Sequence, residues 1–514
     1  MMIAAYSIFS VALIACAFVL FRRNAHIFQL NSYKQKVQQA WVRDHIEALL
    51  LRSVWAFALA PLVNALGKIG FYLSALILLV VLGLNLPRTK EKKPFVFTGR
   101  MKRLLVTDLL LHLFALLFVW FAPDGGAFGA LLASFCIAAA PWLLLLADSL
   151  NRPIEKGINR HYINEAKRIL KESPNLTVIG VTGSYGKTST KFFLEKLLSV
   201  KYNTLITPEN YNTTLGVVRT VRERLRATHD VFVCEMGARN VGDIREICDL
   251  VHPSYGVITA IGEQHLESFK SIGNIVKTKF ELADALPSDG TLFANLDNDR
   301  IKNQCKKCSV PVVGYGLNGG DYTAENLRVS PKGSRFTVKG VEFETKLLGK
   351  HNVQNLCGAI AVANTLGIPL EQLRLPVSRL EGVAHRLQLL GGGKRCVIDD
   401  AYNSNPAGAL AALEQLSSFE ELRILVTPGM VELGSDQERL NREFGVQAAS
   451  RCDYAVLVGQ VNREAIRAGL LAEGFPAEKL FCVDTLSEAI AKADALEAER
   501  NRVILLENDL PDNY

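Results

Sequence analysis

Apolar residues form long uninterrupted runs before about residue 150 and recur at short helix and strand periods after it. Four of these runs come close to the ~20 residues that a helix needs to cross the hydrocarbon core of a bilayer. They cover residues 2–21, 69–86, 104–122 and 126–148. A fifth, shorter run at 53–67 contains Pro61. The pattern predicts a transmembrane helical region over 1–150 and a soluble α/β protein beyond it.

The basic residues between the apolar runs predict the topology. They cluster at 22–47, at 87–103 and just after residue 150. If all three clusters are cytoplasmic, the positive-inside rule is satisfied, and this requires 53–67 to cross as well. We therefore expect five spans with the N-terminus outside, because a four-span arrangement puts 22–67 on the wrong side. The expected location is the cell membrane, multi-pass, with the soluble domains in the cytoplasm.

Composition removes several classes of function. Apolar residues make up 49% of the 514, which excludes a disordered chain. Lys and Arg total 58 against 51 acidic residues, a net charge of +7 that is too weak for a nucleic-acid-binding face. We therefore expect no nucleic-acid partner. Asp108 and His112 stand four residues apart within one apolar run and are expected to share a helix face, either as a functional pair or as residues wetted near the membrane surface.

A phosphate-binding loop follows the first soluble strand. The apolar segment 176–181 runs directly into Thr-Gly-Ser-Tyr-Gly-Lys-Thr-Ser-Thr at 182–190, and a helical stretch follows. Strand, Gly-rich turn, Lys-Thr and helix together are the context that supports a phosphate loop. Backbone N–H groups and the helix N-terminus favour phosphate there. The expected nucleotide contacts are Gly183, Ser184, Gly186, Lys187, Thr188 and Ser189.

A carboxylate ends the apolar strand 231–235. Glu235 is its last residue and is followed by Met-Gly-Ala. The carboxyl end of a strand in a doubly wound sheet opens into the crevice where ligands bind. An unpaired buried carboxylate is costly, so a ligand-binding role for Glu235 is favoured over a purely structural one.

From these motifs onward the chain resembles the Mur ligase family, and within it the members that add D-alanyl-D-alanine. The resemblance covers about residues 175–510. It rests on the phosphate loop, on 210–216 (Asn-Tyr-Asn-Thr-Thr-Leu-Gly), 231–238, 265–267 (His-Leu-Glu), 275–282, 293–299, 348–355 and 397–406 (Val-Ile-Asp-Asp-Ala-Tyr-Asn-Ser-Asn-Pro). It implies an ADP-forming acid–amino acid ligase of cell-envelope synthesis that uses ATP and Mg²⁺ and forms an acyl phosphate.

The resemblance also implies residue roles. Mg²⁺ ligands would be Thr188, Glu235, His265 and a carbamoylated Lys279, with Lys277 as the alternative lysine. Catalytic roles would fall on Lys187, Lys279, His265 and Arg386. Nucleotide contacts would come from Asn295, Asp299, His351, Asn352 and Asn355, and from Arg386, Asp400, Tyr402 and Asn403 across the cleft.

The chain departs from the family pattern at three places, and the second and third bear on substrate choice. Ala384-His385-Arg386 stands where the family has Pro-Gly-Arg. After the last strand, Glu507-Asn508-Asp509 replaces the family's Lys-Gly-Ser, so an incoming group other than D-alanyl-D-alanine is possible. Membrane spans replace the family's uridine-binding domain, which suggests an acceptor at the membrane surface.

The expected architecture is α/β after a helical membrane bundle. We expect a transmembrane region at 1–150, a linker helix at 151–174, a central ATP-binding domain with a parallel sheet at 175–384 and a Rossmann-like C-terminal domain at 385–514. The expected partners are an amino acid or peptide amine, a membrane-linked or nucleotide-linked carboxylate acceptor, and the lipid bilayer. The alternatives are a membrane-tethered polyamide-forming ligase and a non-catalytic nucleotide-binding regulator.

Overall fold

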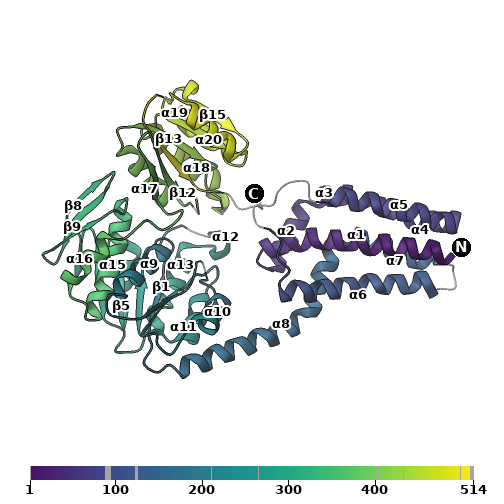
Figure 1. The fold of residues 1–514 in the computed structure, drawn as a ribbon, viewed down its shortest axis with the longest axis horizontal. Coiled ribbons are helices and arrows are strands. Elements are labelled where there is room, and N and C mark those ends of the chain that lie inside the picture. The colour runs from purple at the N-terminus through teal and green to yellow at the C-terminus, as the bar shows by residue number, and fades with distance from the viewer. Residues whose placement is uncertain are drawn as a thin grey trace. The chain divides into compact units, whose positions relative to one another are not determined.

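The computed structural model describes residues 2–86, 94–121, 126–209, 211–263, 266–402, 404–431, 433–497 and 499–509. The chain forms two compact units (Figure 1). Their described parts are 2–160, here called unit 1, and 161–509, here called unit 2. Each unit is described by itself.

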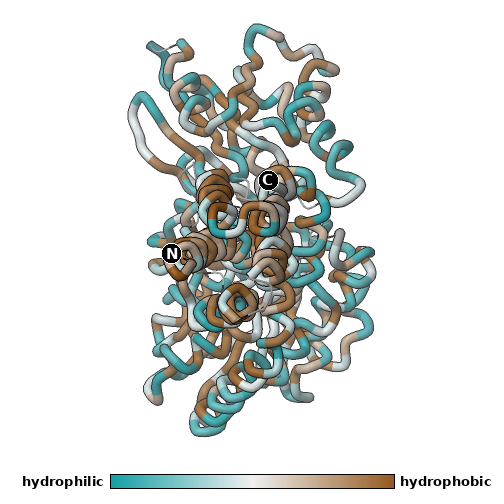
Figure 2. Tube along the Cα trace, turned by 90° about the vertical axis from the view of Figure 1, so that its right-hand side faces the viewer, coloured by the Kyte–Doolittle hydropathy of each residue, from teal (hydrophilic) through white to brown (hydrophobic). Residues whose placement is uncertain are grey.

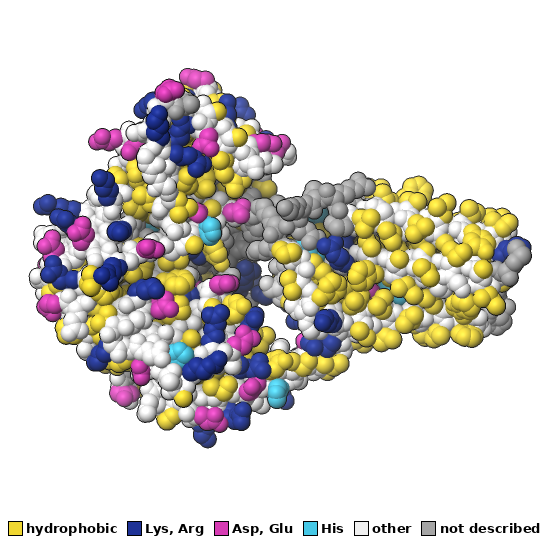
Figure 3. Space-filling model, in the orientation of Figure 1, with side chains coloured by type: hydrophobic (Ala, Val, Ile, Leu, Met, Phe, Trp, Pro, Cys, Tyr) yellow, Lys and Arg dark blue, Asp and Glu magenta, His cyan; other side chains and the backbone are white. Residues whose placement is uncertain are grey.

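Helices are the regular elements of unit 1, whose described residues contain no strand. Its elements are α1 (Met2–Leu30), α2 (Gln35–Asp44), α3 (Ile46–Ser53), the 3₁₀ turn η1 (Val54–Ala58), α4 (Leu59–Leu66), α5 (Lys68–Asn85), α6 (Gly99–Phe121), α7 (Ala127–Ala138) and the first part of α8 (Ala140–Lys171). Hydrophobic residues dominate these helices (Figure 2). Large apolar side chains remain exposed on their outer faces, as in Val11, Leu110 and Phe121 (Figure 3).

The polar residues of unit 1 meet at one end of its helices. Gln35 donates to the Asp148 carboxylate at 2.9 Å, and Arg100 forms an ion pair with the same carboxylate at 2.8 Å. Arg103 binds Glu155 through two hydrogen bonds of 2.6 and 3.0 Å. The starts of α2 and α6 and the middle of α8 are therefore side by side. This brings together parts of the three basic segments that were expected on one side of the membrane.

Aromatic side chains gather at the opposite end of unit 1. The rings of Tyr6 and Phe9 on α1 lie 4.7 and 5.4 Å from Phe71, near the start of α5. The ring of Trp120, at the end of α6, lies 5.5 Å from Tyr6. Between α2 at the polar end and α5 at the aromatic end, the chain therefore traverses the unit through 46–66.

Three helices, α1, α5 and α6, are long and apolar enough to cross a membrane, and the pair α7–α8, bent by 86°, makes a fourth if it counts as one span. The fifth predicted span, 53–67, differs from expectation because it is not one helix. The segment is divided into α3, η1 and α4, and its apolar stretch Trp55–Leu66 is shorter than a spanning helix. Asp108 and His112 do share a face of α6 and are buried together, with 3.6 Å between His112 Nδ1 and the carboxylate.

Unit 2 begins with a seven-stranded parallel sheet in the order β2-β3-β1-β4-β5-β6-β7. The strands are β1 (Thr177–Thr182), β2 (Thr204–Ile206), β3 (Val231–Glu235), β4 (Tyr255–Ile258), β5 (Thr291–Asn295), β6 (Val312–Gly316) and β7 (Tyr322–Thr323). The crossovers contain α9 (Lys187–Leu198), α10 (Thr214–Arg224), α11 (Asp243–Val251), α12 (Leu266–Phe269), α13 (Ile272–Phe280), η2 (Ala283–Ala285) and α14 (Asp299–Cys305). Central strands such as β3 are buried along their full length, as expected of a sheet covered on both faces.

A small antiparallel sheet and two helices complete this domain. The sheet is β8 (Glu325–Ser330), β9 (Gly333–Val338) and β10 (Val341–Thr345), and the helices are α15 (Lys350–Thr365) and α16 (Leu370–Ser378). Helix α15 packs against α9, and its buried residues join the core that contains β1 and β3. The helix that carries the phosphate loop is thereby fixed between the sheet and α15.

The C-terminal domain has a six-stranded sheet in the order β11-β12-β16-β13-β14-β15, parallel except for β11. Its elements are β11 (Gln388–Gly392), β12 (Arg395–Asp400), α17 (Pro406–Ser417), β13 (Leu422–Thr427), η3 (Gly434–Asp436), α18 (Gln437–Ala449), β14 (Tyr454–Val458), α19 (Arg463–Ala472), η4 (Ala477–Lys479), β15 (Leu480–Val483), α20 (Leu486–Ala495) and β16 (Arg502–Glu507). In the register of β12 and β16, Asp400 pairs with Glu507 at the carboxyl ends of both strands.

The predicted linker helix differs from the observed one. Helix α8 starts at Ala140, inside the last predicted apolar run, and continues to Lys171. Pro153 lies within it. The boundary between the two units falls inside this helix, after Arg160.

Candidate active site

The phosphate loop joins β1 to α9, as the sequence predicts. Gly186 precedes the helix with a φ of 80°, in the left-handed region that favours glycine. A Cβ at this position would lie 2.7 Å from Oδ1 of Asn355, so the close approach of α15 excludes larger residues as well. The Asn355 side chain on α15 therefore packs against the loop at Gly186. Ser184 is buried and bonds the backbone of Gly262.

The side chain of Lys187, the first residue of α9, folds back onto the phosphate loop. Its ammonium donates to the carbonyl oxygens of Gly183 at 2.7 Å and Ser184 at 3.0 Å. Burial lowers the pKa of Lys187 to about 8, although the nearby Glu235 carboxylate raises it, and the charge of Arg386 lowers it further. The two predicted cations are therefore close enough for the charge of Arg386 to affect Lys187.

Glu235 lies beside the loop, because Val181 and Glu235 are register partners in β1 and β3. Its carboxylate accepts a hydrogen bond from the Thr188 hydroxyl at 3.2 Å and another from Asn212 at 3.0 Å. Burial pulls its pKa upward, but the ammonium groups of Lys191 and Lys187 hold the pKa below its ordinary value. Glu235 is therefore an anion at neutral pH.

Lys191 is a residue of the site that the sequence analysis missed. Its ammonium is fully buried, 2.9 Å from the Glu235 carboxylate, and it also donates to the Glu209 carbonyl at 2.6 Å. The available signal was the position of a lysine four residues after Lys187 on a helix whose inner face is buried.

Lys279 is buried on α13, whereas Lys277 is not. Burial, and next the positive charge of Lys187, lower the pKa of Lys279 well below its ordinary value. Both effects favour the neutral amine over the ammonium form. A neutral amine is the form that reacts with CO₂, so the chemistry of the position suits the predicted carbamate.

The predicted nucleotide contacts on β5 and α15 are largely satisfied within the protein. Asn295 is buried and donates to the Thr259 carbonyl at 2.7 Å, and Asn352 donates to the Leu348 carbonyl at 2.9 Å. Burial lowers the pKa of His351 to about 4, so it is a neutral imidazole. Asp299 is exposed at the first position of α14. Of these residues, Asp299 has the side chain most open to a ligand.

Across the cleft, the linker 379–387 and β12 supply the predicted C-terminal residues. The Arg386 guanidinium carbon lies 4.2 Å from the centre of the Tyr402 ring. The Asp400 carboxylate accepts a hydrogen bond from the Leu387 N–H at 3.0 Å, and burial raises the pKa of Asp400 to about 6. Arg386, Asp400 and Tyr402 are thus one group.

Arg386 stands between two residues with left-handed backbones. His385 has a φ of 59° and Leu387 a φ of 49°, a conformation that costs a non-glycine residue roughly 1 kcal/mol. Each neighbour is held by one of the paired carboxylates that end β12. His385 Nδ1 lies 2.8 Å from the Asp399 carboxylate, and the Leu387 N–H bonds Asp400. These contacts hold a non-glycine residue at position 385 in the left-handed region.

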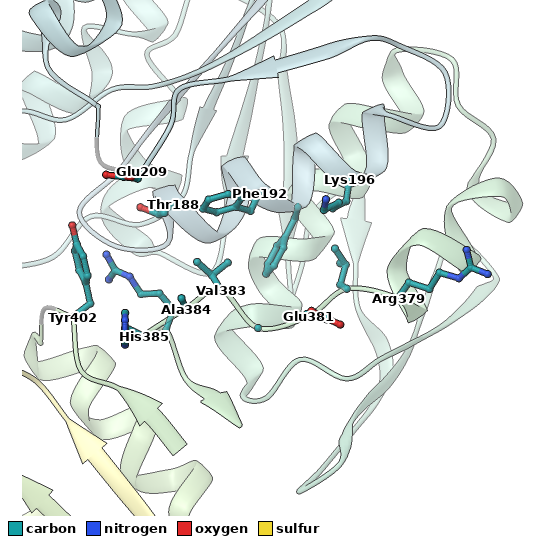
Figure 4. Close-up of a pocket in the computed structure, with 14 residues that line it drawn as sticks. Thr188, Phe192, Lys196, Glu209, Arg379, Glu381, Val383, Ala384, His385 and Tyr402 are labelled. Atoms are coloured by element: carbon teal, nitrogen blue, oxygen red, sulfur yellow. The ribbon is translucent and has the colours of Figure 1, made fainter. Parts of the chain in front are cut away.

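A cavity of about 750 Å³ opens beside these groups and continues along α9 (Figure 4). Its lining is Thr188, Phe192, Phe193, Lys196, Glu209, Arg379, Leu380, Glu381, Gly382, Val383, Ala384, His385, Arg386 and Tyr402. Thr188, Phe192 and Lys196 follow one face of α9, and Val383, Ala384 and Tyr402 lie opposite. Both domains of unit 2 contribute to it.

The site residues fit Mg²⁺. The described residues contain no cluster of three or more His, Cys, Asp or Glu side chains that could hold a metal ion. Mg²⁺ does not need one, because it is usually bound through one or two carboxylates, waters and substrate phosphates. The Thr188 hydroxyl and the ionised Glu235 carboxylate provide adjoining oxygens at the helix N-terminus. His265 and Asn403 lie outside the described residues.

Comparison with known proteins identifies the family. The Mur ligase middle domain matches residues 181–363, and the Mur ligase glutamate ligase domain matches 385–507. The chain is 34% identical over 339 residues to the UDP-N-acetylmuramoyl-tripeptide–D-alanyl-D-alanine ligase of Bacillus subtilis, covering 65% of this chain and 72% of that protein. It is 31% identical to the Escherichia coli protein of the same name, covering 62% and 72%.

A solved structure agrees. The chain superposes on MurF from Acinetobacter baumannii with a TM-score of 0.62 and 28% identity, covering 68% of this chain and 77% of that one. Neither matched family domain includes residues 1–180. The chain belongs to the Mur ligase family, and it is an ATP- and Mg²⁺-dependent, ADP-forming ligase that makes amide bonds.

Proposed function

We propose that this ligase joins an amino acid or peptide amine to a carboxylate presented at the membrane surface, with unit 1 spanning the bilayer and unit 2 in the cytoplasm. The observation that carries the proposal is the apolar exterior of unit 1, which precedes the ligase domains in the same chain. A water-soluble acceptor, such as the UDP-linked tripeptide in the names of the relatives, gives no reason for such an exterior.

The chain's own residues suit the chemistry of the family. Lys187 would neutralise charge on the transferring phosphoryl group of ATP, and Arg386 would do so from the other domain. Transfer to the acceptor carboxylate gives an acyl phosphate, which must be shielded from water until the amine attacks. The contact of Arg386 with Tyr402 and the carboxylates that hold its neighbours fix its position for this role.

Residues near the phosphate loop would hold the metal. We assign Thr188, Glu235, His265 and carbamoylated Lys279 as its ligands. A divalent ion bound there supplies positive charge to the phosphate oxygens. Gly183, Ser184, Gly186 and Ser189 would hold the phosphates, with Asn295, Asp299, His351, Asn352, Asn355, Asp400, Tyr402 and Asn403 around the rest of the nucleotide.

The network at the polar end of unit 1 supports the topology. Gln35, Arg100 and Asp148 hold the starts of α2 and α6 against α8, so the described residues around these contacts in all three basic segments lie at one end. The Tyr6–Trp120 pair at the other end suits the outer interface, where such rings are enriched. Five traverses, one of them broken at η1, are consistent with this arrangement.

The experiment is Mg²⁺-dependent phosphate release by the detergent-purified full-length protein with pooled amino acids and dipeptides, with and without a membrane-lipid extract. We expect release to require both the lipid extract and one amine pool. Lys187→Ala should reduce it by at least about 100-fold, whereas Lys302→Ala on α14, outside the site, should not. Full release with UDP-muramoyl tripeptide and no lipid would overturn the membrane acceptor but not the ligase.

A further inference from the structure

The first part of α8, residues 140–160, turns away from the direction of the spanning helices of unit 1. Helix α7 packs antiparallel along α6, from the contact of the Phe128 and Phe118 rings at 5.2 Å to the cluster that Cys136 shares with Leu111. The axis of α8 is bent by 86° from that of α7. With α6 across the membrane, α8 therefore starts nearly parallel to the membrane plane.

The ion pairs between α8 and α6 keep this part of α8 at one depth. Asp148 and Glu155 are seven residues apart on α8, a rise of about 10 Å. Their partners, Arg100 at 2.8 Å and Arg103 at 2.6 Å, are three residues apart at the start of α6. Both arginines precede the apolar part of α6, residues 104–121. Residues 148–155 of α8 therefore lie at the boundary between the membrane and the cytoplasm.

The exposed side of this part of α8 carries an apolar stripe. Four large apolar side chains recur every four residues, so they follow one side of the helix, and between 44% and 55% of each is exposed. They are Trp142, Leu146, Leu150 and Ile154. Leu144 and Ala147, on the other side of the helix, are buried in unit 1. The apolar stripe thus continues the apolar exterior of the spanning helices.

The exposed charges on the same part of α8 are all positive. Its two acidic residues, Asp148 and Glu155, are buried and paired with the arginines of α6. Its three basic residues, Arg152, Lys156 and Arg160, are exposed. Lys156 and Arg160 have no ion-pair partner within the described part of the chain. An apolar stripe with basic residues beside it is typical of a helix that lies in the membrane interface and binds anionic lipid.

We propose that residues 140–160 form an in-plane helix on the inner leaflet, which binds anionic phospholipid headgroups through Arg152, Lys156 and Arg160 and buries the apolar stripe at the level where the acyl chains begin. The inference rests on the membrane placement of unit 1 under the proposed function and adds a lipid-binding surface to it. Charge complementarity selects anionic over zwitterionic lipid, because each basic residue near a negatively charged membrane favours binding about fivefold.

The first test measures the depth of the apolar stripe. Trp142 becomes the single tryptophan of the full-length protein when Trp41, Trp55 and Trp120 are changed to Phe. This protein is reconstituted into vesicles of equal amounts of phosphatidylcholine and phosphatidylglycerol. Lipids brominated near the headgroup or near the chain end quench tryptophan fluorescence by contact. We expect the shallow bromines to quench Trp142 at least about twice as strongly as the deep ones.

Two matched proteins, in which Trp142 is also changed to Phe, carry the single tryptophan elsewhere. Leu113→Trp, at an exposed position of α6, should be quenched most by the deep bromines, and Leu375→Trp, exposed on α16 of unit 2, should not be quenched. If Leu113→Trp is not quenched, the membrane placement of unit 1 fails, and this inference fails with it. If Leu113→Trp is quenched but Trp142 is quenched mainly by the deep bromines, or not at all, only the in-plane helix is overturned. Deep quenching would make α8 part of a span, and no quenching would mean that protein covers the stripe.

The second test measures the preference for lipid charge. Quenching of Trp142 is compared when the shallow bromines are carried by phosphatidylglycerol or by phosphatidylcholine, at the same total composition. We expect half-maximal quenching to need at least about threefold less brominated phosphatidylglycerol. The variant Arg152→Gln/Lys156→Gln/Arg160→Gln should lose this preference and keep its shallow depth.

The control for charge removal changes three exposed lysines of unit 2 in the same way. The variant Lys302→Gln/Lys306→Gln/Lys307→Gln should keep the preference for phosphatidylglycerol. Equal quenching by the two brominated lipids in the protein with its basic residues intact would overturn the binding of anionic headgroups. A preference that survives the change of all three basic residues on α8 would overturn their assignment.

Discussion

Lys187 and Lys279 are buried close to each other, and burial is the largest cause of the lowered pKa of each. Lys187 keeps carbonyl partners that favour its charged form. For Lys279, the largest effect is burial and the next is repulsion by Lys187. One residue type therefore provides a cation for phosphate at one position and, at the other, an amine whose neutral form is favoured by its surroundings.

We expect Lys279→Ala to lose at least about 100-fold of the phosphate-release activity, since it removes a group beside the transferring phosphate. Added bicarbonate should not restore that activity. Wild-type protein depleted of CO₂ should lose activity and regain it with bicarbonate, because the neutral Lys279 amine can then be carbamoylated again. Full activity of Lys279→Ala would rule out a metal-ligating role for this residue.

Glu507 should make the free energy of unfolding fall as pH rises, whereas an ion-paired carboxylate makes it rise. Burial raises its pKa to about 7, and hydrogen bonds from Ser404 and Thr427 lower it only in part. The folded state therefore keeps this proton up to about pH 7, whereas the unfolded state releases it near the ordinary glutamate pKa of 4.5. This contribution to stability is complete below the unfolded pKa and is lost as pH rises toward 7.

Glu507→Gln should consequently stabilise the protein at pH 8 by up to about 3 kcal/mol relative to wild type, because it removes the ionisable group and keeps polar partners for both hydroxyls. At pH 4 the difference should nearly vanish. The measurement is thermal unfolding of the full-length protein in detergent at both pH values. A stability difference independent of pH would contradict this account of Glu507.

At the scale of elements, the pairing of α9 with β3 depends on a buried ion pair. Lys191 and Glu235 are both nearly inaccessible to solvent and lie 2.9 Å apart. Lys191→Met leaves the carboxylate buried without this partner and should lower the free energy of unfolding by about 3–5 kcal/mol. The double variant Lys191→Met/Glu235→Gln should be less destabilised than Lys191→Met alone, as measured by thermal unfolding. The reverse order would show that the pair does not hold the two elements together.

In the linker 379–387, the contact of His385 with Asp399 offsets the cost of the left-handed backbone at His385. His385 adopts a left-handed backbone and is held by Asp399. His385→Ala keeps the strained backbone and loses that contact, so Arg386 should be misplaced and phosphate release should fall about tenfold. His385→Gly also loses the contact but relieves the strain, and it should therefore retain several-fold more activity than His385→Ala.

Measuring kcat, the KM for ATP and thermal unfolding of His385→Ala distinguishes a misplaced Arg386 from a general loss of folding. A misplaced Arg386 should affect kcat most, whereas thermal unfolding should place His385→Ala within about 1–2 kcal/mol of wild type. Equal activity of the Ala and Gly variants would show that backbone strain at 385 has no bearing on Arg386.

At the scale of the whole molecule, the proposed topology puts 31–44, 94–103 and the middle of α8 on one side of the membrane. Single cysteines introduced at Lys36, Lys102 and Lys156 should all be shielded from an impermeant maleimide in intact cells and labelled after permeabilisation. A cysteine at Lys68, at the start of α5, should react in intact cells. Labelling of the Lys36→Cys variant before permeabilisation would contradict five traverses and support a four-span arrangement.

The positions of many residues of the candidate site could be predicted from sequence because the signals are local. The turn at 182–190 lies between a strand and a helix, so its shape follows from its own glycines and its immediate neighbours. Glu235 could be placed because it ends an apolar strand, and parallel strands bring their carboxyl ends to one edge. Asp108 and His112 share a helix face for the same local reason.

Other features depend on segments far apart in the chain, and only the tertiary structure decided them. The partner of Glu235 is Lys191, 44 positions earlier, and the partner of His385 is Asp399 on β12. The cavity exists because the linker 379–387 passes along α9. The acidic residue at 507 suggested an incoming group other than D-alanyl-D-alanine, but in the fold that carboxylate is buried and accepts hydrogen bonds from two hydroxyls. Local pattern determines which element forms and which residues it offers, whereas burial, pairing and pKa depend on what the rest of the chain places beside them.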